Sequence, residues 1–474
     1  MNKFRVIALI LTLGFMAGPT QAQEPHAHLQ SLLELTEHPP TSPPTAIKAW
    51  KLRQNTKVLF VENHALPMID LKISFAAGSL HDGDSPGLAT MVYSLFNEGS
   101  ALKDATAQAK AFDDLGVILG GNISKEQSSF TLRSLSSADV REPALRVFTE
   151  MLAQPGFSIE GQRRAKNQLI ALLQSEQKKP QKRAKALLYK ELYPGQPVAR
   201  HVYGSVDSIE RIDSAQLQAF YRRAYTAANA HIEIVGDLTP EQAQTLSQTL
   251  ADALPSGPAL SEIGTSLSSP SDDKELNLED DATQSMLMLA QNTLPNQHPD
   301  ALAIRIGHEI FKHLLNAQLR EKHSVTYGVL SSAPPARNTT PWIINLNTPA
   351  YYSLSAMAHI KTEFARFLEE GPTEQELNET KRYLQRTQPQ LTVSNLNLLN
   401  ELSVINRFDQ PLDFTYKAQR IETLTREQIK TAMQRHLSAQ GWVSVIVGPT
   451  VEQLPLPNTQ QVASTTELSC KSTN

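Results

Sequence analysis

Two histidines and a glutamate in the second half of the chain have the residue types of a zinc peptidase site. His308 and Glu309 are followed by His313, a pattern close to His-Glu-x-x-His, in which two histidines on one helical face bind zinc. The spacing is one residue too long, because five residues of an α-helix turn through about 500° and leave the two histidines about 140° apart. The sequence therefore predicts exposed or partly buried helix histidines here and no zinc site.

A second stretch, residues 87–100, has the spacing of the inverted motif His-x-x-Glu-His but different residue types. Thr90, Tyr93 and Ser94 hold the i, i+3 and i+4 positions at which two zinc ligands and a general base would share one helical face. None of these types is a good zinc ligand or a carboxylate base. Its apolar residues recur at helical spacing: Leu88, Met91, Val92 and Leu95. We therefore expect a short helix with the frame of a metal-binding helix but without its ligands.

Composition and charge exclude several function classes. The net charge is −4, from 44 basic and 48 acidic residues, and no block of like charge resembles a nucleic-acid-binding tail. The most basic run, residues 178–185, is predicted to be a solvated helix end. The sequence has no Gly-x-Ser-x-Gly elbow, no phosphate-binding loop and no catalytic cysteine context. We therefore expect no nucleic-acid partner and none of these catalytic classes.

The start of the chain has the pattern of a secretory signal. Lys3 and Arg5 precede an apolar run over residues 6–17, which is too short to span a bilayer stably, although a retained N-terminal anchor is the alternative. No later stretch is long and apolar enough for a span. The single cysteine, Cys470, permits no intrachain disulfide, which fits a bacterial periplasm. We expect an exported, periplasmic protein with no membrane span after signal cleavage.

Hydrophobic periodicity predicts strands and helices that do not alternate strictly, which favours an α+β fold. The predicted strands are 57–61, 68–75, 117–123, 128–135, 231–235, 284–291, 327–332, 342–347 and 443–447. The predicted helices, beyond the one in 87–100, are 104–115, 139–152, 159–177, 181–192, 214–224, 299–322, 354–370, 373–384 and 428–436.

An internal repeat organises these elements. Ile209-Glu210 recurs as Ile421-Glu422 and Val235-Gly236 as Val447-Gly448, without a gap, since 421 − 209 and 447 − 235 are both 212. Both copies place a helix before a β-branched strand that ends at a glycine. We infer two homologous duplicated domains, each a mixed or antiparallel sheet packed against several helices.

The predicted organisation follows from this repeat and from the polar stretches around it. In order, it is a signal peptide (1–22), a flexible N-terminal arm (23–46), an N-terminal peptidase-like domain (47–254), a linker (255–275), a C-terminal peptidase-like domain (276–453) and a disordered tail (454–474). The linker is rich in Pro, Ser and Gly, and the tail in Ser, Thr and Gln.

Short motifs in order along the chain support a family resemblance. They include Ala77-Gly78-Ser79, Gly87-Leu88-Ala89, Gly99-Ser100, Pro155-Gly156-Phe157, Tyr203-Gly204, Gly236-Asp237, Leu319-Arg320-Glu321 and Tyr327-Gly328. With the duplication, the chain resembles the pitrilysin family of inverzincin metallopeptidases in its two-domain form. It is similar to bacterial processing peptidases and mitochondrial processing peptidase subunits. The resemblance covers nearly the whole chain after the signal sequence.

The resemblance implies that the zinc site is degenerate. The family's His, Glu and His fall on Thr90, Tyr93 and Ser94, and its downstream glutamate ligand falls on Leu172. All ligands and the base are thus replaced. We expect this chain to bind no metal or other cofactor and to hydrolyse no peptide alone, because a peptidase of this class needs a metal-activated water.

The resemblance also implies residues that act without zinc. Family members direct an Arg and a Tyr of the second domain toward the zinc site of another domain, and Arg320 and Tyr327 match them. A guanidinium can hold a carbonyl or carboxylate, and a phenol can donate to an oxyanion. The alternative is that Arg320 pairs with Glu321 or another local acid and Tyr327 is a sheet residue. Family substrates add as a strand to a sheet edge, and the counterpart here is Gly121, Asn122 and Ile123.

These implications lead to one main hypothesis. The chain would be the non-zinc subunit of a periplasmic heterodimeric metallopeptidase that helps to form the peptide chamber. Its partner would be a zinc-bearing paralogous subunit, which receives Arg320 and Tyr327, and its substrates would be peptides. The alternative is a peptide-binding or scaffold homologue that acts as a homodimer without catalysis. A self-sufficient peptidase with an unrecognised site is a third hypothesis.

Overall fold

The computed structural model describes residues 46–265 and 270–457, here called the first and second halves. These residues belong to one compact unit. The predicted signal peptide, the predicted arm up to residue 45 and residues 458–474 of the predicted tail lie outside the described residues. Among the helices described, none combines the length and apolar character needed to cross a membrane.

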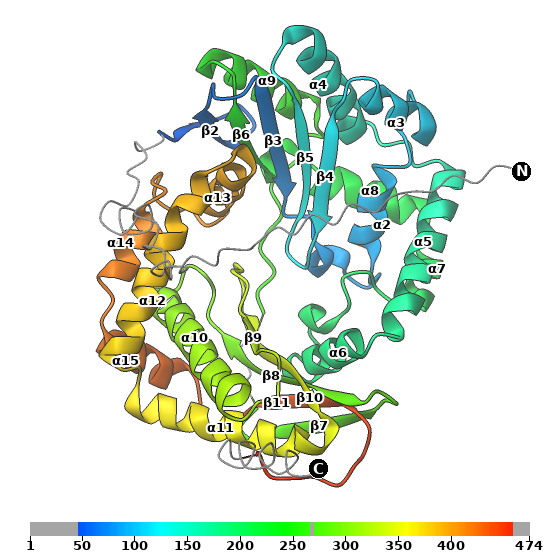
Figure 1. Cartoon of the computed structure of the whole chain (residues 1–474). Helices are drawn as coiled ribbons and strands as arrows, with labels where there is room; N and C mark the ends of the chain where they lie inside the picture. The colour runs from blue at the N-terminus through cyan, green and yellow to red at the C-terminus, as the bar shows by residue number, and fades with distance from the viewer. Residues whose placement is uncertain (1–45, 266–269, 458–474) are drawn as a thin grey trace, which may run out of the picture. The chain divides into compact units, whose positions relative to one another are not determined.

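The first half is built around a six-stranded sheet, in the order β1-β2-β6-β3-β5-β4 (Figure 1). Its strands are β1 (Lys48–Lys51), β2 (Lys57–Glu62), β3 (Met68–Phe75), β4 (Ile118–Ile123), β5 (Ser128–Leu135) and β6 (Ala230–Gly236). Strands β2 and β6 are parallel, and the other neighbours are antiparallel. Alternate residues of β3, such as Ile69, Leu71 and Ile73, are fully buried, as expected for a strand with an apolar face.

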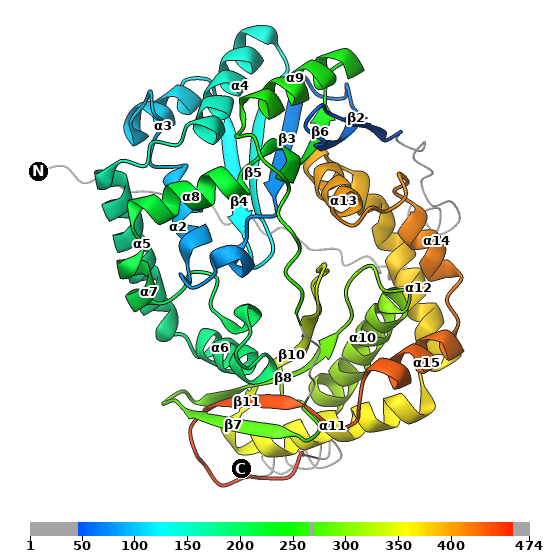
Figure 2. The same ribbon diagram turned by 180° about the vertical axis from the view of Figure 1, so that it is seen from behind.

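Helices cover this sheet and join its strands. They are α2 (Leu88–Leu95), α3 (Ala105–Asp113), α4 (Ala138–Ala153), α5 (Ile159–Gln177), α6 (Pro180–Leu192), α7 (Val206–Arg211), α8 (Ser214–Ala224) and α9 (Pro240–Ala253). Helices α4 and α9 lie beside each other against the sheet, as Figure 2 shows from behind. Helix α2 packs between α5 and α8, so the degenerate zinc positions lie within this layer.

The second half repeats this topology. Its sheet has the order β7-β11-β8-β10-β9, with β7 (Lys274–Glu279), β8 (Gln284–Thr293), β9 (Leu330–Ser332), β10 (Thr340–Pro349) and β11 (Val443–Gly448). The parallel pair β7–β11 corresponds to β2–β6, and the antiparallel strands follow in the same order. Its helices are α10 (Ala301–Leu315), α11 (Ser353–Glu370), α12 (Glu374–Thr387), α13 (Asn395–Arg407), α14 (Tyr416–Glu422) and α15 (Arg426–His436). The predicted α+β fold with duplicated domains is confirmed.

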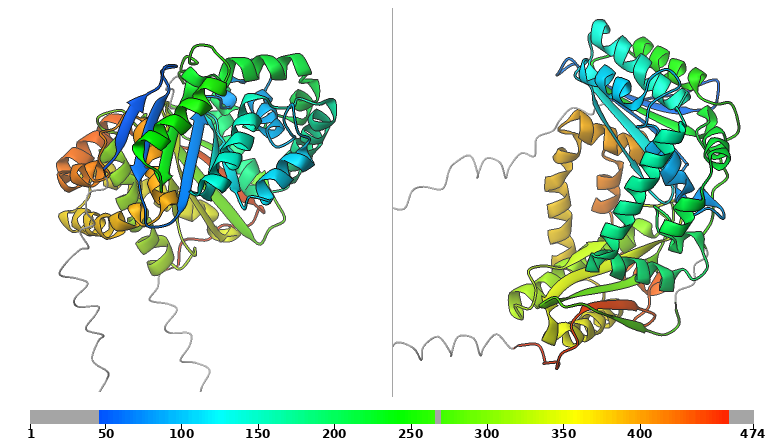
Figure 3. Two further views of the ribbon diagram at one scale, coloured as in Figure 1. Left: turned by 90° about the horizontal axis from the view of Figure 1, so that it is seen from above. Right: turned by 90° about the vertical axis from the view of Figure 1, so that its right-hand side faces the viewer.

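The two halves exchange a helix. Helix α6 of the first half packs on β8 and β11 of the second sheet, and α13 packs on β2, β3 and β6 of the first (Figures 1 and 3). Buried Leu188 and Leu192 of α6 share a core with Val443 and Val445. Leu398 and Leu402 of α13 share another core with Leu59 and Val235. Each sheet therefore has one layer of its core supplied by the other half.

Two predicted elements of the second half were wrong in detail. The helix predicted over residues 299–322 is α-helical only from Ala301 to Leu315 and continues as a π-helix over Asn316–Lys322. The strand predicted to begin at residue 327 begins at Leu330. One side chain, that of Asn316, explains the difference. Its Oδ1 accepts from the amide of Val329 (3.0 Å) and its Nδ2 donates to the Val329 carbonyl (3.3 Å), which replaces a strand partner there.

Candidate functional site

Helix α2, which bears the degenerate zinc positions, is fixed at its N-terminus by Asp82. The Asp82 carboxylate accepts hydrogen bonds from the backbone amides of Gly87 and Ala89, both at 2.7 Å. Burial raises the pKa of Asp82 to about 7, against these two hydrogen bonds and the nearby cations. Gly87 precedes the helix at φ 92°, a left-handed conformation that favours glycine. The frame of the helix is therefore tightly specified.

The side chains at the family's two histidine positions are satisfied by backbone carbonyls. Thr90 is buried and its hydroxyl donates to the carbonyl of Val202 at 2.7 Å. The Ser94 hydroxyl donates to the carbonyl of Thr90 at 2.9 Å, the local hydrogen bond that serine often makes within a helix. Both hydroxyl groups therefore serve the packing of α2.

At the family's glutamate position, Tyr93 packs against the sheet edge. Its ring lies 5.1 Å from that of Phe130, and its hydroxyl is 3.5 Å from the Ser129 carbonyl. Burial raises the pKa of Tyr93 to about 12, so the phenol is neutral at physiological pH. A Cβ on Gly121 of β4 would lie 2.5 Å from this hydroxyl. The structure thus brings together two residues that the sequence assigned to different roles.

The fourth zinc position, Leu172, lies on α5, which packs on α2. Its side chain is 38% exposed and offers no ligand atom. With Thr90 and Ser94 it completes the three zinc-ligand positions of the family, and Tyr93 holds the position of the general base. Two hydroxyls bound to carbonyls, a neutral phenol and an alkyl chain do not fit a zinc ion, which prefers imidazole, thiolate and carboxylate ligands.

The predicted peptide-binding strand is the edge of the first sheet. Strand β4 pairs only with β5 among the described strands, so its other side carries unpaired backbone groups. Gly121 and Asn122 are exposed and Ile123 is half-buried. A peptide in an extended conformation could hydrogen-bond along this edge.

Arg320 and Tyr327 lie close in sequence on a braced segment of the second half. Arg320 is on the π-helix, and Tyr327 precedes β9 with 91% of its side chain exposed. Neither has a hydrogen-bond or ion-pair partner among the described residues, so Arg320 makes no salt bridge to Glu321. Besides the two Asn316 bonds, the amide of Val325 donates to the Leu319 carbonyl at 2.9 Å. The backbone is thus held while both side chains point into solvent.

The histidines of α10 share no site. His308 is buried and stacks on Trp342 with ring centroids 3.9 Å apart, and burial lowers its pKa to about 3. His313 is exposed and lies 3.2 Å from Glu309. His313 is exposed as predicted, whereas the prediction was wrong for His308, which is fully buried because its ring packs on Trp342 in the core.

Three residues that the sequence did not single out together could approach a metal. Nitrogen and oxygen atoms of His298, Asp300 and His436 lie within 4.8 Å of one another. However, the Asp300 oxygen that faces His436 at 2.9 Å also accepts from the Arg435 guanidinium at 2.9 Å. These two partners, His436 first, lower the free energy of the ionised carboxylate and explain its lowered pKa. The cluster is satisfied as an ion-pair network.

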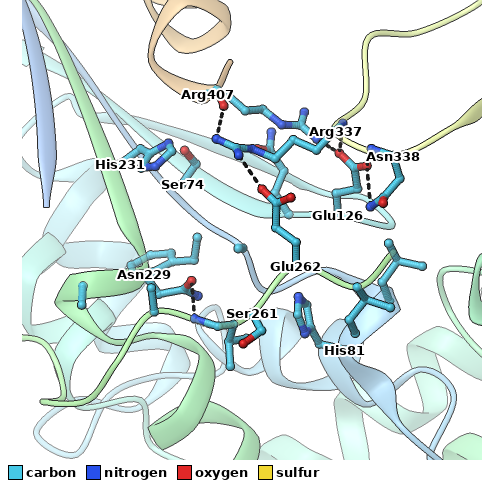
Figure 4. Close-up of a pocket in the computed structure, with 18 residues that line it drawn as sticks. Ser74, His81, Glu126, Asn229, His231, Ser261, Glu262, Arg337, Asn338 and Arg407 are labelled. Carbon is cyan, nitrogen blue, oxygen red and sulfur yellow. Dashed lines mark hydrogen bonds and ion pairs between the residues drawn. The ribbon is translucent and has the colours of Figure 1, made fainter. Parts of the chain in front are cut away.

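A cavity of about 220 Å³ lies where the two halves meet (Figure 4). Glu126, in the turn between β4 and β5, accepts from the backbone amides of Arg337 (3.1 Å) and Asn338 (3.0 Å) and from the Arg407 guanidinium. Arg337 also pairs with Glu262. These charged groups compensate one another, so this region joins the halves.

A second cavity, next to Val202, has a lining that sequence analysis did not predict. Its basic residues are Lys125, Lys182, Lys185, Arg200 and His201. The signal was the basic run at residues 178–185. That run was interpreted as a solvated helix end, and its four lysines are indeed exposed, but Lys182 and Lys185 also line this cavity.

Comparisons with known proteins agree with this geometry. Residues 57–206 match the family model described as insulinase (peptidase family M16), and residues 211–384 match the peptidase M16 inactive domain. A crystal structure of a peptidase M16 inactive domain from Pseudomonas fluorescens is 37% identical, with a TM-score of 0.82, over 87% of this chain and 100% of that one.

More distant relatives are similar along most of the chain. A curated non-peptidase homolog, YmxG of Helicobacter pylori, is 24% identical over 82% of this chain and 91% of its own length. The periplasmic protease PqqL of Escherichia coli shares the fold, with a TM-score of 0.71 at 15% identity, over 85% of this chain and 46% of that one. The chain therefore belongs to peptidase family M16, the pitrilysin-type metallopeptidases, as a homologue whose zinc-binding positions hold no zinc ligand.

Proposed function

We propose that this chain is the non-zinc subunit of a heterodimeric M16 peptidase in the periplasm. It would help to enclose peptide substrates and would supply Arg320 and Tyr327 to the active site of a zinc-bearing paralogous subunit. The chain itself would bind no cofactor, and the zinc would belong to the partner.

The observation that carries this proposal is the state of Arg320 and Tyr327. Both side chains are exposed and have no partner among the described residues, and Asn316 braces the backbone that follows Arg320 and Tyr327. They are therefore available to a group outside this chain. A guanidinium and a phenol can stabilise the oxyanion that develops when water attacks a peptide carbonyl. The chain lacks the ligands and the base for that attack, so the attacking water must be activated elsewhere.

Two features support the remaining parts of the proposal. The free edge of β4 offers unpaired backbone groups to an extended peptide. The basic and apolar pattern of residues 1–22 supports export, and the single cysteine is compatible with an oxidising compartment.

The test is a peptidase assay with the full chain alone, a zinc-bearing M16 chain from the same source alone, and the two mixed. We expect activity to rise in the mixture. Arg320→Ala and Tyr327→Phe should each lower kcat of the mixture. The loss should be up to about 10²–10³-fold, the factor that one oxyanion donor contributes. Matched controls are Arg382→Ala and Tyr383→Phe, which change exposed residues of α12 and should leave kcat unchanged.

Several outcomes would count against the subunit role. Activity of the mixture that both substitutions leave intact would exclude a contribution from this pair. One mole of zinc bound per mole of this chain alone would contradict the assignment of the metal to the partner. Peptide binding by the chain as a homodimer, without any gain in activity on mixing, would favour the alternative function, a non-catalytic peptide-binding scaffold that uses the free edge of β4.

A further inference from the structure

The basic cavity beside α2 has a volume of about 170 Å³ and is surrounded by cations. Its walls come from four segments: the end of β4 with the turn that follows, the C-terminal end of α5, one face of α6 and the loop that carries Arg200 and His201. Its charged lining residues are Lys125, Glu176, Lys182, Lys185, Arg200 and His201. Glu176 is the single acid among them.

The one carboxylate in the cavity is already engaged. Glu176 is buried and lies 2.5 Å from the Lys182 ammonium and 3.0 Å from the His201 ring nitrogen. It therefore compensates Lys182 and partly His201.

The other three cations make their hydrogen bonds and ring contacts with neutral groups, and the carboxylates of Asp82 and Glu176 act on them only at longer range. Lys125 donates to the Arg200 carbonyl at 2.6 Å and lies 4.7 Å from the centre of the Tyr189 ring. Lys185 lies 5.8 Å from the same ring, and Arg200 donates to the carbonyl of Gly83. None of the three has a carboxylate within ion-pair distance among the described residues.

Three of the cationic groups, Lys125, Lys185 and His201, have lowered pKa values, mainly because they are partly buried. Burial, together with the neighbouring Lys185, lowers the pKa of Lys125 to about 8. Burial and Lys182 likewise lower the pKa of Lys185, and burial lowers that of His201. An anion in the cavity would stabilise the charged forms of all three groups.

The cavity lies at one end of the edge strand. Ile123, the last residue of β4, is part of its lining, and Lys125 follows in the turn. Val202, also in the lining, accepts the Thr90 hydrogen bond from α2. A peptide that pairs with β4 and extends past Ile123 would therefore reach this cavity.

We propose that this cavity binds a carboxylate of a peptide held along β4, either an acidic side chain or the peptide's C-terminal carboxylate. The inference rests on the proposed function only in taking the peptide to lie on β4. Hydrogen bonds from ammonium and guanidinium groups to a carboxylate are among the stronger ones, so the cavity would select acidic peptides.

The test measures binding of fluorescent decapeptides to the full chain by anisotropy. The peptides are rich in Val and Thr and have an amidated C-terminus. Each contains a single Glu, at a different position in each peptide, and is compared with a peptide that has Gln at that position. A further peptide has no Glu and a free C-terminal carboxylate. The variants are Lys185→Met and Lys125→Met, and the control is Lys190→Met, an exposed lysine of α6 that does not line the cavity.

For the wild-type chain we expect at least one Glu peptide, or the peptide with the free carboxylate, to bind about tenfold tighter than its neutral counterpart. Which of the two does so identifies the source of the carboxylate. Lys185→Met should remove most of that preference and leave binding of the Gln peptide unchanged, and Lys190→Met should preserve it. Lys185 makes no hydrogen bond that this substitution would break in the described structure, so its variant remains informative if Lys125→Met destabilises the fold.

Two results would overturn the proposal. One is equal binding of acidic and neutral peptides at every position, and the other is a preference that survives both lysine substitutions. Either result leaves the Arg320 and Tyr327 assay of the mixed subunits untouched. Conversely, failure of that assay with the acidic preference intact would reject the subunit role and retain the carboxylate site.

Discussion

A Cβ atom on Gly121 would lie 2.5 Å from the hydroxyl oxygen of Tyr93. The side chain at the family's catalytic glutamate position therefore fills the space above the edge strand, and the glycine leaves room for it. Tyr93 also contacts the Phe130 ring. The former catalytic position now contributes to the packing of α2 on the sheet.

We predict that Gly121→Ala destabilises the protein. The added methyl group would also lie 2.3 Å from the backbone carbonyl oxygen of Ser129, which cannot rotate away. Forcing a methyl group into a packed site costs about 1–3 kcal/mol of unfolding free energy. The measurement is the urea midpoint. Gly120→Ala is the matched control, because its closest atom is the rotatable Thr131 hydroxyl at 2.7 Å. Equal midpoints for the two variants would contradict this account.

We predict that zinc binding can be restored on this frame. The variant Thr90→His, Tyr93→Glu, Ser94→His and Leu172→Glu would carry the family's residues on α2 and α5, which pack together. We expect about one zinc per chain by elemental analysis after dialysis. A matched variant without Leu172→Glu should bind more weakly. Failure of the fourfold variant to bind zinc, despite a wild-type circular dichroism spectrum, would show that the positions are misaligned.

The sequence predicted the elements whose patterns are local. The strand Met68–Phe75 and the helices Ile159–Gln177 and Ser214–Ala224 have the predicted bounds, because each has a clear apolar period and an end signal. The gapless repeat likewise located α8 and α15. Each of these helices precedes the strand that comes last in the chain order of its sheet, β6 or β11.

Elements stabilised by distant contacts were missed. Strand β7 pairs with β11, about 170 residues away, and its short Lys-Glu-Leu-Asn-Leu-Glu stretch has little apolar signal of its own. Helix α13 buries Leu398 and Leu402 on the sheet of the other half. The cationic cavity was missed for the same reason, since Lys125, Lys185 and Arg200 converge only in the folded chain.

We predict that Glu126→Ala weakens the junction between the halves. The carboxylate accepts two backbone amides and the Arg407 guanidinium, and their loss leaves these donors unsatisfied. A lost buried partner costs about 1–3 kcal/mol. The urea midpoint should therefore fall. Glu160→Ala, which breaks a surface pair with Arg163, is the control and should leave the midpoint nearly unchanged, because exposed ion pairs contribute little. A Glu126 variant as stable as this control would show that the contacts contribute little.

Finally, we predict a pH dependence of stability that originates at Glu233. This residue of β6 is buried, accepts a hydrogen bond from Asn406 of α13 at 2.7 Å and lies opposite Lys72 in the sheet. Burial raises its pKa from 4.5 to about 7, in spite of Lys72 and Asn406. Between these values the folded state binds more protons at this site than the unfolded state. Its contribution to stability is therefore complete below about pH 4.5 and is lost as the pH rises toward 7.

The variant Glu233→Gln isolates this contribution, because an amide oxygen can still accept from Asn406 and has no proton to lose. Relative to wild type, it should gain stability as the pH rises from about 4.5 to 7, by up to about 3 kcal/mol. The measurement is the difference between the two urea midpoints at each pH, so that Asp82 and other titrating groups cancel. A difference that stays constant with pH would mean that Glu233 remains ionised, paired with Lys72 across the sheet.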